Sequence, residues 1–225
     1  MRLLLISSSL VHGYGYLDHS EEEIRSILGS RRTVAFVPFA QQNVDGYTAR
    51  VRERLGAMGY DVTQVRARGD VESAEALFVG GGNTFRLLKT LYDLDLVEAI
   101  RARVRGGMPY IGSSAGTNVA TPSIRTTNDM PIVYPPTFDA LGLVPFQINP
   151  HYLDPDPTST HKGETREDRI REFHEENTTP VVGLREGSML RVEDATITLV
   201  GNRTARIFRR GETPVELETG STLAL

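Results

Sequence analysis

The sequence contains no cysteine, and this absence excludes several kinds of chemistry at once. Without thiols the chain can form no disulfide bond, no zinc–thiolate site and no cysteine nucleophile. Serine is therefore the nucleophile to look for. A chain without cysteine is also compatible with a reducing compartment, and we expect a cytoplasmic protein.

Long apolar segments and strong charge of one sign are also missing. The apolar run Leu3 to Ile6 is too short for a signal sequence or a membrane span and predicts a first β-strand instead. The net charge is −4 and there is no basic tail, so we expect binding to neither nucleic acid nor membrane. At 225 residues the chain fits a single domain, 1–225, which we expect to be a monomer or a small homo-oligomer.

Short apolar runs alternate with helical patterns through the first half of the chain. This rhythm predicts an α/β fold with a mostly parallel sheet and flanking helices. Ser20 followed by Glu23 resembles a capping box at the start of a helix. Alternating runs after residue 188 predict antiparallel C-terminal strands that extend the same sheet. The predicted strands are 3–6, 34–38, 62–65, 76–79, 110–111 and 181–184, and the predicted helices are 20–28, 45–58, 84–91, 96–105 and 165–176.

Ser114 stands in a Gly-x-Ser-x-Gly pattern between a short strand and helix-compatible sequence. The stretch Tyr110 to Asn118 reads Y-I-G-S-S-A-G-T-N. This pattern is typical of a nucleophile elbow, because the glycines at 112 and 116 leave room for a tight turn with unusual backbone angles. We therefore predict Ser114 as a catalytic nucleophile.

A serine nucleophile needs a base, and the chain has five histidines. His151 follows Ile148-Asn149-Pro150 at the end of an apolar run, where the active-site edge of an open α/β sheet would lie. His161 is the other candidate. His12 and His19 fall in an N-terminal loop and helix start, and His174 is expected on the solvated face of a charged helix.

Two carboxylates could orient the imidazole of this base. Asp129 lies in the polar segment Thr126-Thr127-Asn128-Asp129-Met130-Pro131, which has an apolar end that could turn inward. Glu186 follows the predicted strand 181–184, again at a carboxyl end. The sequence leaves the choice between Asp129 and Glu186 open.

A run of three glycines, Gly80-Gly81-Gly82, lies between a predicted strand and a helix. Backbone N–H groups without side chains suit an oxyanion hole, and we predict that the N–H of Gly81 or Gly82 acts together with the N–H of Ala115. The rival interpretation is a phosphate-binding loop. It is disfavoured because no Gly-Lys-Ser/Thr follows, and Phe85 stands where a dinucleotide-binding fingerprint has its third glycine.

With these residues assembled, the sequence resembles the peptidase E, or α-aspartyl dipeptidase, family of serine peptidases. The resemblance implies a flavodoxin-like, class I glutamine-amidotransferase-like α/β fold and hydrolysis of dipeptides with an N-terminal aspartate, without a metal or other cofactor. Five blocks carry it, in family order: VGGGNTF at 79–85, YIGSSAG at 110–116, IRTTNDMPIV at 124–133, QINPH at 147–151 and HKGETRE at 161–167.

By this resemblance Ser114 is the nucleophile and His151 the base, with Asp129 or Glu186 as the third member. It also implies that Arg166 binds the β-carboxylate of the substrate, a role that suits the planar, permanently charged guanidinium. Glu164 is the candidate for the free α-ammonium group, and Asn83 and Thr84 are further expected substrate contacts. One departure is Ser113, because the family commonly has tryptophan there, and we expect the small residue to alter one wall of the substrate pocket.

Three other functions compete with this interpretation. A general esterase of the α/β-hydrolase type would share the order Ser114, Asp129, His151, but the first two are only 129 − 114 = 15 residues apart, which leaves no room for the usual intervening strand and helix. A catalytically silent relative could bind acidic peptides. A third alternative is a related hydrolase for isoaspartyl or cyanophycin-type substrates.

Overall fold

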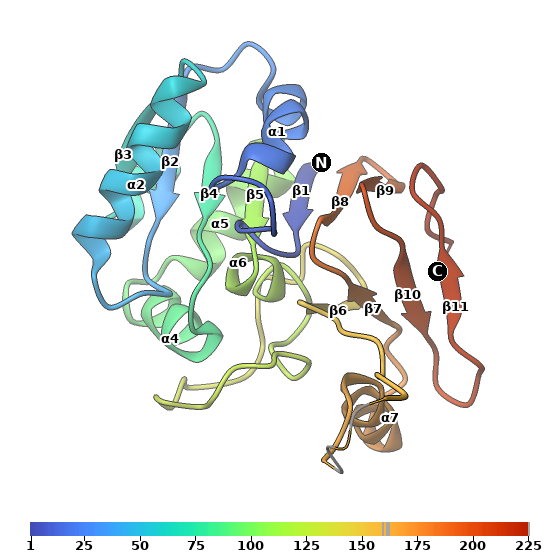
Figure 1. The fold of residues 1–225 in the computed structure, drawn as a ribbon. Coiled ribbons are helices and arrows are strands. Elements are labelled where there is room, and N and C mark those ends of the chain that lie inside the picture. Colours follow the sequence, from blue (N-terminus) through green and yellow to red (C-terminus); the bar gives the residue numbers. More distant parts are fainter. Residues whose placement is uncertain (159, 161–162, 225) are drawn as a thin grey trace.

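Two β-sheets and the helices around them make up the protein (Figure 1). The structure is a computed structural model that describes residues 1–225 except 159, 161–162 and 225. His161, one of the two candidate bases, lies outside the described residues. Within the described part of the chain, no helix has the length and apolar character needed to cross a lipid bilayer.

The larger sheet has seven strands in the order β3-β2-β4-β5-β1-β8-β9. The strands from β3 through β1 run parallel to one another, and β8 and β9 are antiparallel to their neighbours. This arrangement confirms the predicted, mostly parallel α/β sheet with antiparallel C-terminal strands. The strands are β1 (Arg2–Ile6), β2 (Thr33–Val37), β3 (Asp61–Gln64), β4 (Leu77–Val79), β5 (Tyr110–Ser113), β8 (Ser188–Glu193) and β9 (Thr196–Gly201).

Helices cover both faces of this sheet, because successive side chains of a strand point to opposite faces. Leu4 and Ile6 of β1 pack with the buried residues of α1 and α2, whereas Leu3 and Leu5 pack with those of α4 and α5. The helices are α1 (Glu21–Leu28), α2 (Val44–Ala57), α3 (Arg68–Glu72), α4 (Thr84–Asp93), α5 (Val97–Arg105), α6 (Ala115–Asn118) and α7 (Arg166–Glu176), with a short 3-10 helix at Asp18–Ser20.

A second sheet of four strands, in the order β11-β10-β7-β6, corrects the expectation that all later strands extend the first sheet. β6 and β7 pair in parallel, and β10 and β11 add antiparallel strands. One face joins the main core, and α7 covers the other through Ile170, which packs with Tyr152, Val181 and Phe208 (Figure 1). The strands are β6 (Gln147–Pro150), β7 (Val181–Leu184), β10 (Ala205–Phe208) and β11 (Val215–Leu217).

The apolar run 141–148 forms less strand than its composition suggests. Only Gln147 and Ile148 of this run belong to a strand, and residues 119–146 contain no helix or strand. Leu141, Leu143 and Phe146 are nevertheless buried in the main core. Apolar side chains buried in the main core therefore anchor this long connection.

Two local predictions in the helices are wrong. Ser20 forms no capping box, because the preceding 3-10 turn gives it a non-extended backbone and its hydroxyl donates to the carbonyl of Leu17 instead. His174 is only 7% exposed rather than solvated. It lies one turn after Ile170 on the buried face of α7, and its Nε2 lies 3.1 Å from the carbonyl oxygen of Thr179.

Candidate active site

Ser114 sits on a sharp turn between β5 and α6. Its φ of 53° and ψ of −108° are strained for a residue with a side chain, as expected of a nucleophile elbow. Both flanking glycines are sterically required. A Cβ on Gly112 would lie 2.5 Å from the carbonyl oxygen of Gly116, and a Cβ on Gly116 would lie 2.1 Å from the carbonyl oxygen of Val79.

His151 follows β6 directly and faces Ser114. Its Nε2 lies 2.8 Å from Oγ of Ser114. The backbone at His151 also has a positive φ, 53°, and its N–H donates to Oγ of Ser7, which in turn donates to the carbonyl of Leu184. Ser7 follows β1, so one buried hydroxyl connects the larger sheet to the ends of β6 and β7.

Glu186 is the carboxylate that contacts the imidazole. Its Oε1 lies 2.6 Å from Nδ1 of His151. A carboxylate can only accept at this contact, so Nδ1 carries the proton and Nε2 is left to accept from the hydroxyl of Ser114. The structure thus joins Ser114, His151 and Glu186 in one chain of hydrogen bonds.

Asp129 lies at the start of α4 and not against the imidazole. Its Oδ2 accepts from the backbone N–H of Thr84 at 2.8 Å and from the Thr84 hydroxyl at 2.5 Å. A helix N-terminus offers unpaired N–H groups and a positive dipole end, which favour a carboxylate. Asp129 therefore holds the polar loop 125–131 against the helix that follows the glycine run.

The glycine run lies against the serine. A Cβ on Gly81 would be 3.0 Å from Cβ of Ser114, so only glycine permits this approach without displacement. The N–H of Gly81 donates to the hydroxyl of Tyr47 at 2.8 Å. Among the described residues, the N–H groups of Gly82 and Ala115 have no hydrogen-bond acceptor. Gly82 is thus better suited than Gly81 to offer a free N–H beside Ser114.

Arg166 is the first residue of α7 and is half-buried. Burial lowers the pKa of its guanidinium, the charge of Arg169 lowers it further, and Asp129 raises it. Within the described part of the chain Arg166 has no ion-pair partner, whereas neighbouring Arg169 lies 3.5 Å from a carboxylate oxygen of Glu164. A half-buried cation without a partner is electrostatically prepared for an anionic ligand.

Two cavities are lined by residues predicted to contact the substrate. One of about 580 Å³ is lined by Asp129, Phe85 and Phe138, and another of about 410 Å³ is lined by Arg166. Glu164 and Arg169 line both. The candidates Arg166 and Glu164 therefore border one connected region of the surface.

The remaining predicted contacts are engaged within the protein. Nδ2 of Asn83 donates to the carbonyl of Met130 and its Oδ1 caps α4, while the hydroxyl of Thr84 is held by Asp129. Ser113 is fully buried in β5. The expectation that a small residue at this position alters one wall of the substrate pocket stays a prediction.

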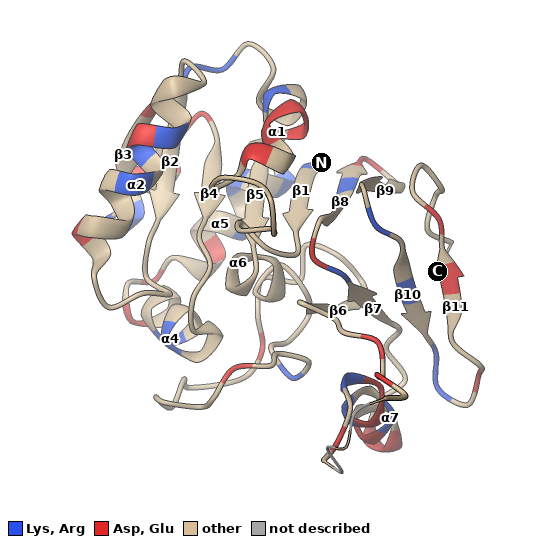
Figure 2. Ribbon diagram, viewed as in Figure 1, with Lys and Arg blue, Asp and Glu red and all other residues tan. Residues whose placement is uncertain are grey.

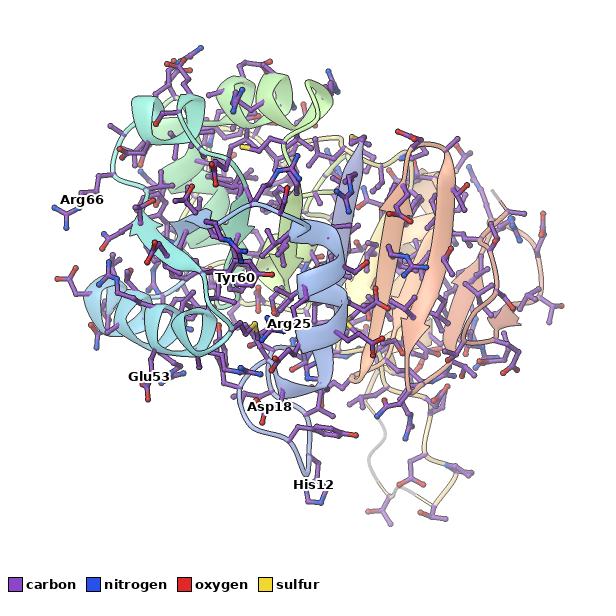
Figure 3. The ribbon with its side chains drawn as sticks, turned by 90° about the horizontal axis from the view of Figure 1, so that it is seen from above. His12, Asp18, Arg25, Glu53, Tyr60 and Arg66 are labelled. Carbon is purple, nitrogen blue, oxygen red and sulfur yellow. The ribbon has the colours of Figure 1, made fainter. Side chains whose placement is uncertain are left out.

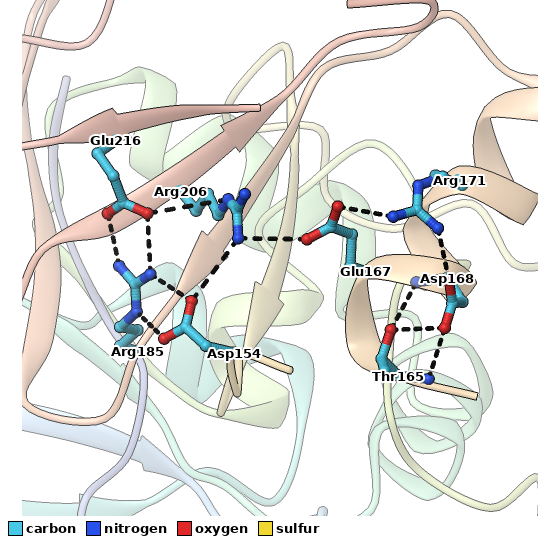
Figure 4. A network of polar contacts seen from close by, with 8 residues as sticks. All are labelled: Asp154, Thr165, Glu167, Asp168, Arg171, Arg185, Arg206 and Glu216. Atoms are coloured by element: carbon cyan, nitrogen blue, oxygen red, sulfur yellow. Dashed lines mark hydrogen bonds and ion pairs between the residues drawn. The ribbon is translucent and has the colours of Figure 1, made fainter. Parts of the chain in front are cut away.

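A network of arginines and carboxylates next to the site was not predicted from the sequence (Figure 4). Arg185, directly before Glu186, has a side chain only 9% exposed and pairs in bidentate fashion with both Asp154 and Glu216. Arg206 lies 3.2 Å from Glu167, the residue after Arg166. The network thus connects the segments that carry His151 and Glu186 with the start of α7, a helix covered by charges of both signs (Figure 2).

A serine that is hydrogen-bonded to a histidine and through it to a glutamate, at the carboxyl end of a parallel strand, is the arrangement found in serine-type hydrolases. Residues 3–200 match the profile of Peptidase family S51. The chain belongs to this family, which confirms the family predicted from its motifs.

Relatives cover the whole chain. A peptidase E from Streptomyces coelicolor is 60% identical over 228 residues, covering 100% of this chain and 94% of that protein. A Drosophila melanogaster protein named "Probable alpha-aspartyl dipeptidase" is 52% identical over 92% of this chain and 89% of its own length. The crystal structure of a peptidase from an acI-B1 actinobacterium shares the fold, with a TM-score of 0.72 at 18% identity over 100% of this chain and 96% of that one.

Proposed function

We propose that this protein is a serine dipeptidase that hydrolyses dipeptides with an N-terminal aspartate. The observation that carries the proposal is the chain of hydrogen bonds from Ser114 through His151 to Glu186. Membership of a peptidase family and 52% identity to the Drosophila protein named as an α-aspartyl dipeptidase support the reaction and the substrate.

The reaction begins when His151 accepts the proton of Ser114 through Nε2. Oγ of Ser114 then forms a bond to the α-carbonyl carbon of the N-terminal aspartate, and the carbonyl oxygen becomes an oxyanion. Glu186 stabilises the imidazolium through Nδ1–H. The N–H groups of Gly82 and Ala115 donate to the oxyanion.

Collapse of this intermediate breaks the peptide C–N bond, and His151 transfers its proton to the leaving amine. The aspartyl group remains on Oγ of Ser114 as an ester. Water, deprotonated by the same imidazole, then attacks the ester and releases aspartate with the hydroxyl of Ser114 restored. Each proton therefore passes through Nε2 of His151.

Selectivity for aspartate is assigned to Arg166. Its guanidinium is half-buried and unpaired among the described residues, so a β-carboxylate would gain a bidentate, charge-assisted contact there. An asparagine side chain could not exploit the charge. Glu164, in the adjoining wall, is proposed to meet the α-ammonium group, and the substrate contacts of Asn83 and Thr84 stay predictions.

The experiment compares release of the N-terminal residue from Asp-Leu, Asn-Leu and β-linked Asp-Leu by the wild type and by Arg166→Met. We expect the wild type to cleave Asp-Leu alone, and Arg166→Met to lose most of its preference for aspartate over asparagine. Arg171→Met serves as a control on the same helix, because among the described residues the ion-pair partners of Arg171 are Glu167 and Asp168. Wild-type cleavage of the β-linked dipeptide instead would reject the α-aspartyl substrate.

A further inference from the structure

Two side chains of one neighbouring segment hold Gly81 on both sides. The backbone N–H of Gly81 donates to the hydroxyl of Tyr47 at 2.8 Å, and its carbonyl oxygen accepts from Nε2 of Gln41 at 3.3 Å. Tyr47 lies in the first turn of α2 and is 3% exposed, and Gln41 precedes that helix. A Cβ on Gly80 would lie 2.6 Å from the Tyr47 hydroxyl, so this contact also depends on glycine.

The backbone around Gly81 is fixed as well. The N–H of Gly80 donates to the carbonyl of Val37 at 3.1 Å, and the N–H of Asn83 donates to the carbonyl of Ala40 at 2.8 Å. In the described structure, Gly82 alone of residues 80–83 has an N–H without an acceptor. Backbone N–H groups in folded proteins are nearly always paired, so a free one beside a nucleophile is available for a ligand.

The planarity of the peptide bond connects these two observations. The carbonyl of Gly81 and the N–H of Gly82 belong to one trans peptide and point in opposite directions. A donor that holds the carbonyl on one side therefore directs the N–H to the other. Gln41 holds this carbonyl, and Tyr47 fixes the preceding peptide plane.

We propose that Tyr47 and Gln41 are positioning residues that orient the Gly81–Gly82 peptide so that the N–H of Gly82 donates to the oxyanion formed at Ser114. This inference rests on the proposed function, because it assigns the supports of the same site. In this role both side chains act through the Gly81–Gly82 peptide rather than through contact with the substrate. Their contribution appears only when negative charge develops in the transition state, so it affects kcat more than KM.

The test uses conservative variants with matched controls. Tyr47→Phe removes only the hydroxyl, and Tyr60→Phe is its control (Tyr60 is labelled in Figure 3). Tyr60 is buried in the same core cluster and has no side-chain hydrogen bond among the described residues. Gln41→Ala removes the amide, and the exposed neighbour Gln42 provides the control Gln42→Ala. Circular dichroism and the midpoint of thermal unfolding establish that each variant is folded.

We expect Tyr47→Phe and Gln41→Ala to lower kcat for Asp-Leu by roughly 10- to 100-fold, since loss of an oxyanion donor costs about 100- to 1,000-fold and misorientation costs less. KM and the inhibition constant of free aspartate should stay within about twofold of the controls. Values of kcat equal to those of the controls, or equal losses in kcat and aspartate binding, would overturn the inference. A fall in kcat for Tyr47→Phe alone would overturn the assignment of Gln41.

Acylation of Ser114 by p-nitrophenyl acetate separates this inference from the proposed substrate. In that reaction Oγ bonds to the acetyl carbon, the proton passes to His151 and p-nitrophenolate leaves, and the oxyanion forms at the same place. If the wild type failed to cleave Asp-Leu, the proposed function would be wrong. Slower acetylation in both variants than in their controls would still support the role of Tyr47 and Gln41, and unchanged acetylation would overturn it.

Discussion

Glu186 reaches His151 because Pro150 and Leu184 lie opposite each other in the parallel pairing of β6 and β7. The two strands end side by side, so the residues that follow them leave the sheet at the same edge. Nδ1 of His151 and Oε1 of Glu186 are 2.6 Å apart as a result. Strand pairing therefore places the Glu186 carboxylate against the imidazole of His151.

Replacement of Glu186 should lower activity, whereas replacement of Asp129 should lower stability. Glu186→Gln should lower kcat roughly a hundredfold or more, because it removes the acceptor that fixes the tautomer and stabilises the imidazolium. Asp129→Asn should lower the free energy of unfolding by about 1 kcal/mol through its weaker contact with the start of α4, with kcat nearly unchanged. Steady-state kinetics and urea unfolding of both variants check this; a larger loss of kcat in Asp129→Asn would reverse the assignment.

Gly116→Ala adds one methyl group but should distort the turn that carries Ser114. The added Cβ would lie 2.1 Å from the backbone carbonyl of Val79, which is itself in a central strand and cannot yield easily. We expect lower stability and loss of most activity. Gly56→Ala, near the end of α2, is the control, because among the described residues its Cβ would meet no atom within 4 Å outside the backbone of its own helix. Alanine in place of a helical glycine should stabilise the protein by about 0.5–1 kcal/mol.

The ion pairs of Arg185 predict how stability responds to acid. Hydrogen bonds from Arg185 lower the pKa of the Asp154 carboxyl in the folded protein. A carboxyl group whose pKa is lowered by folding stabilises the folded protein at pH values above its ordinary pKa, near 4. This stabilisation is lost as the pH falls through the pKa of the carboxyl in the folded protein. Between pH 7 and pH 3, wild type should therefore lose more unfolding free energy than Asp154→Asn, measured by urea unfolding. Equal losses in the two proteins would contradict this.

The sequence was sufficient to find Ser114, because its surroundings are local: an apolar strand, two sterically required glycines and a short helix follow one another along the chain. The alternation of strands and helices likewise predicted the parallel sheet. Ser20 shows the limit of local patterns, because its hydroxyl donates to the carbonyl of Leu17 in a 3-10 turn before the helix and does not form the predicted cap.

Other parts of the site depend on pairing between distant segments. The residues around Asp129 and Glu186 do not indicate which strand pairs with β6. The sequence alone therefore could not predict which of the two carboxylates contacts His151, since that contact depends on the register of the second sheet. Tyr47 lies in a segment whose pattern predicted only a helix, and Gln41 lies just before it. The strand runs after residue 200 could not reveal that they form a separate sheet, because alternation identifies a strand and not its neighbour.

The role of Ser114 as nucleophile can be tested by measuring release of free aspartate from Asp-Leu by wild type and by Ser114→Ala, with circular dichroism to establish that the variant is folded. We expect cleavage by the wild type and a loss of at least about a thousandfold in Ser114→Ala, because the nucleophile is removed. Cleavage that persists in a folded Ser114→Ala protein would contradict this role.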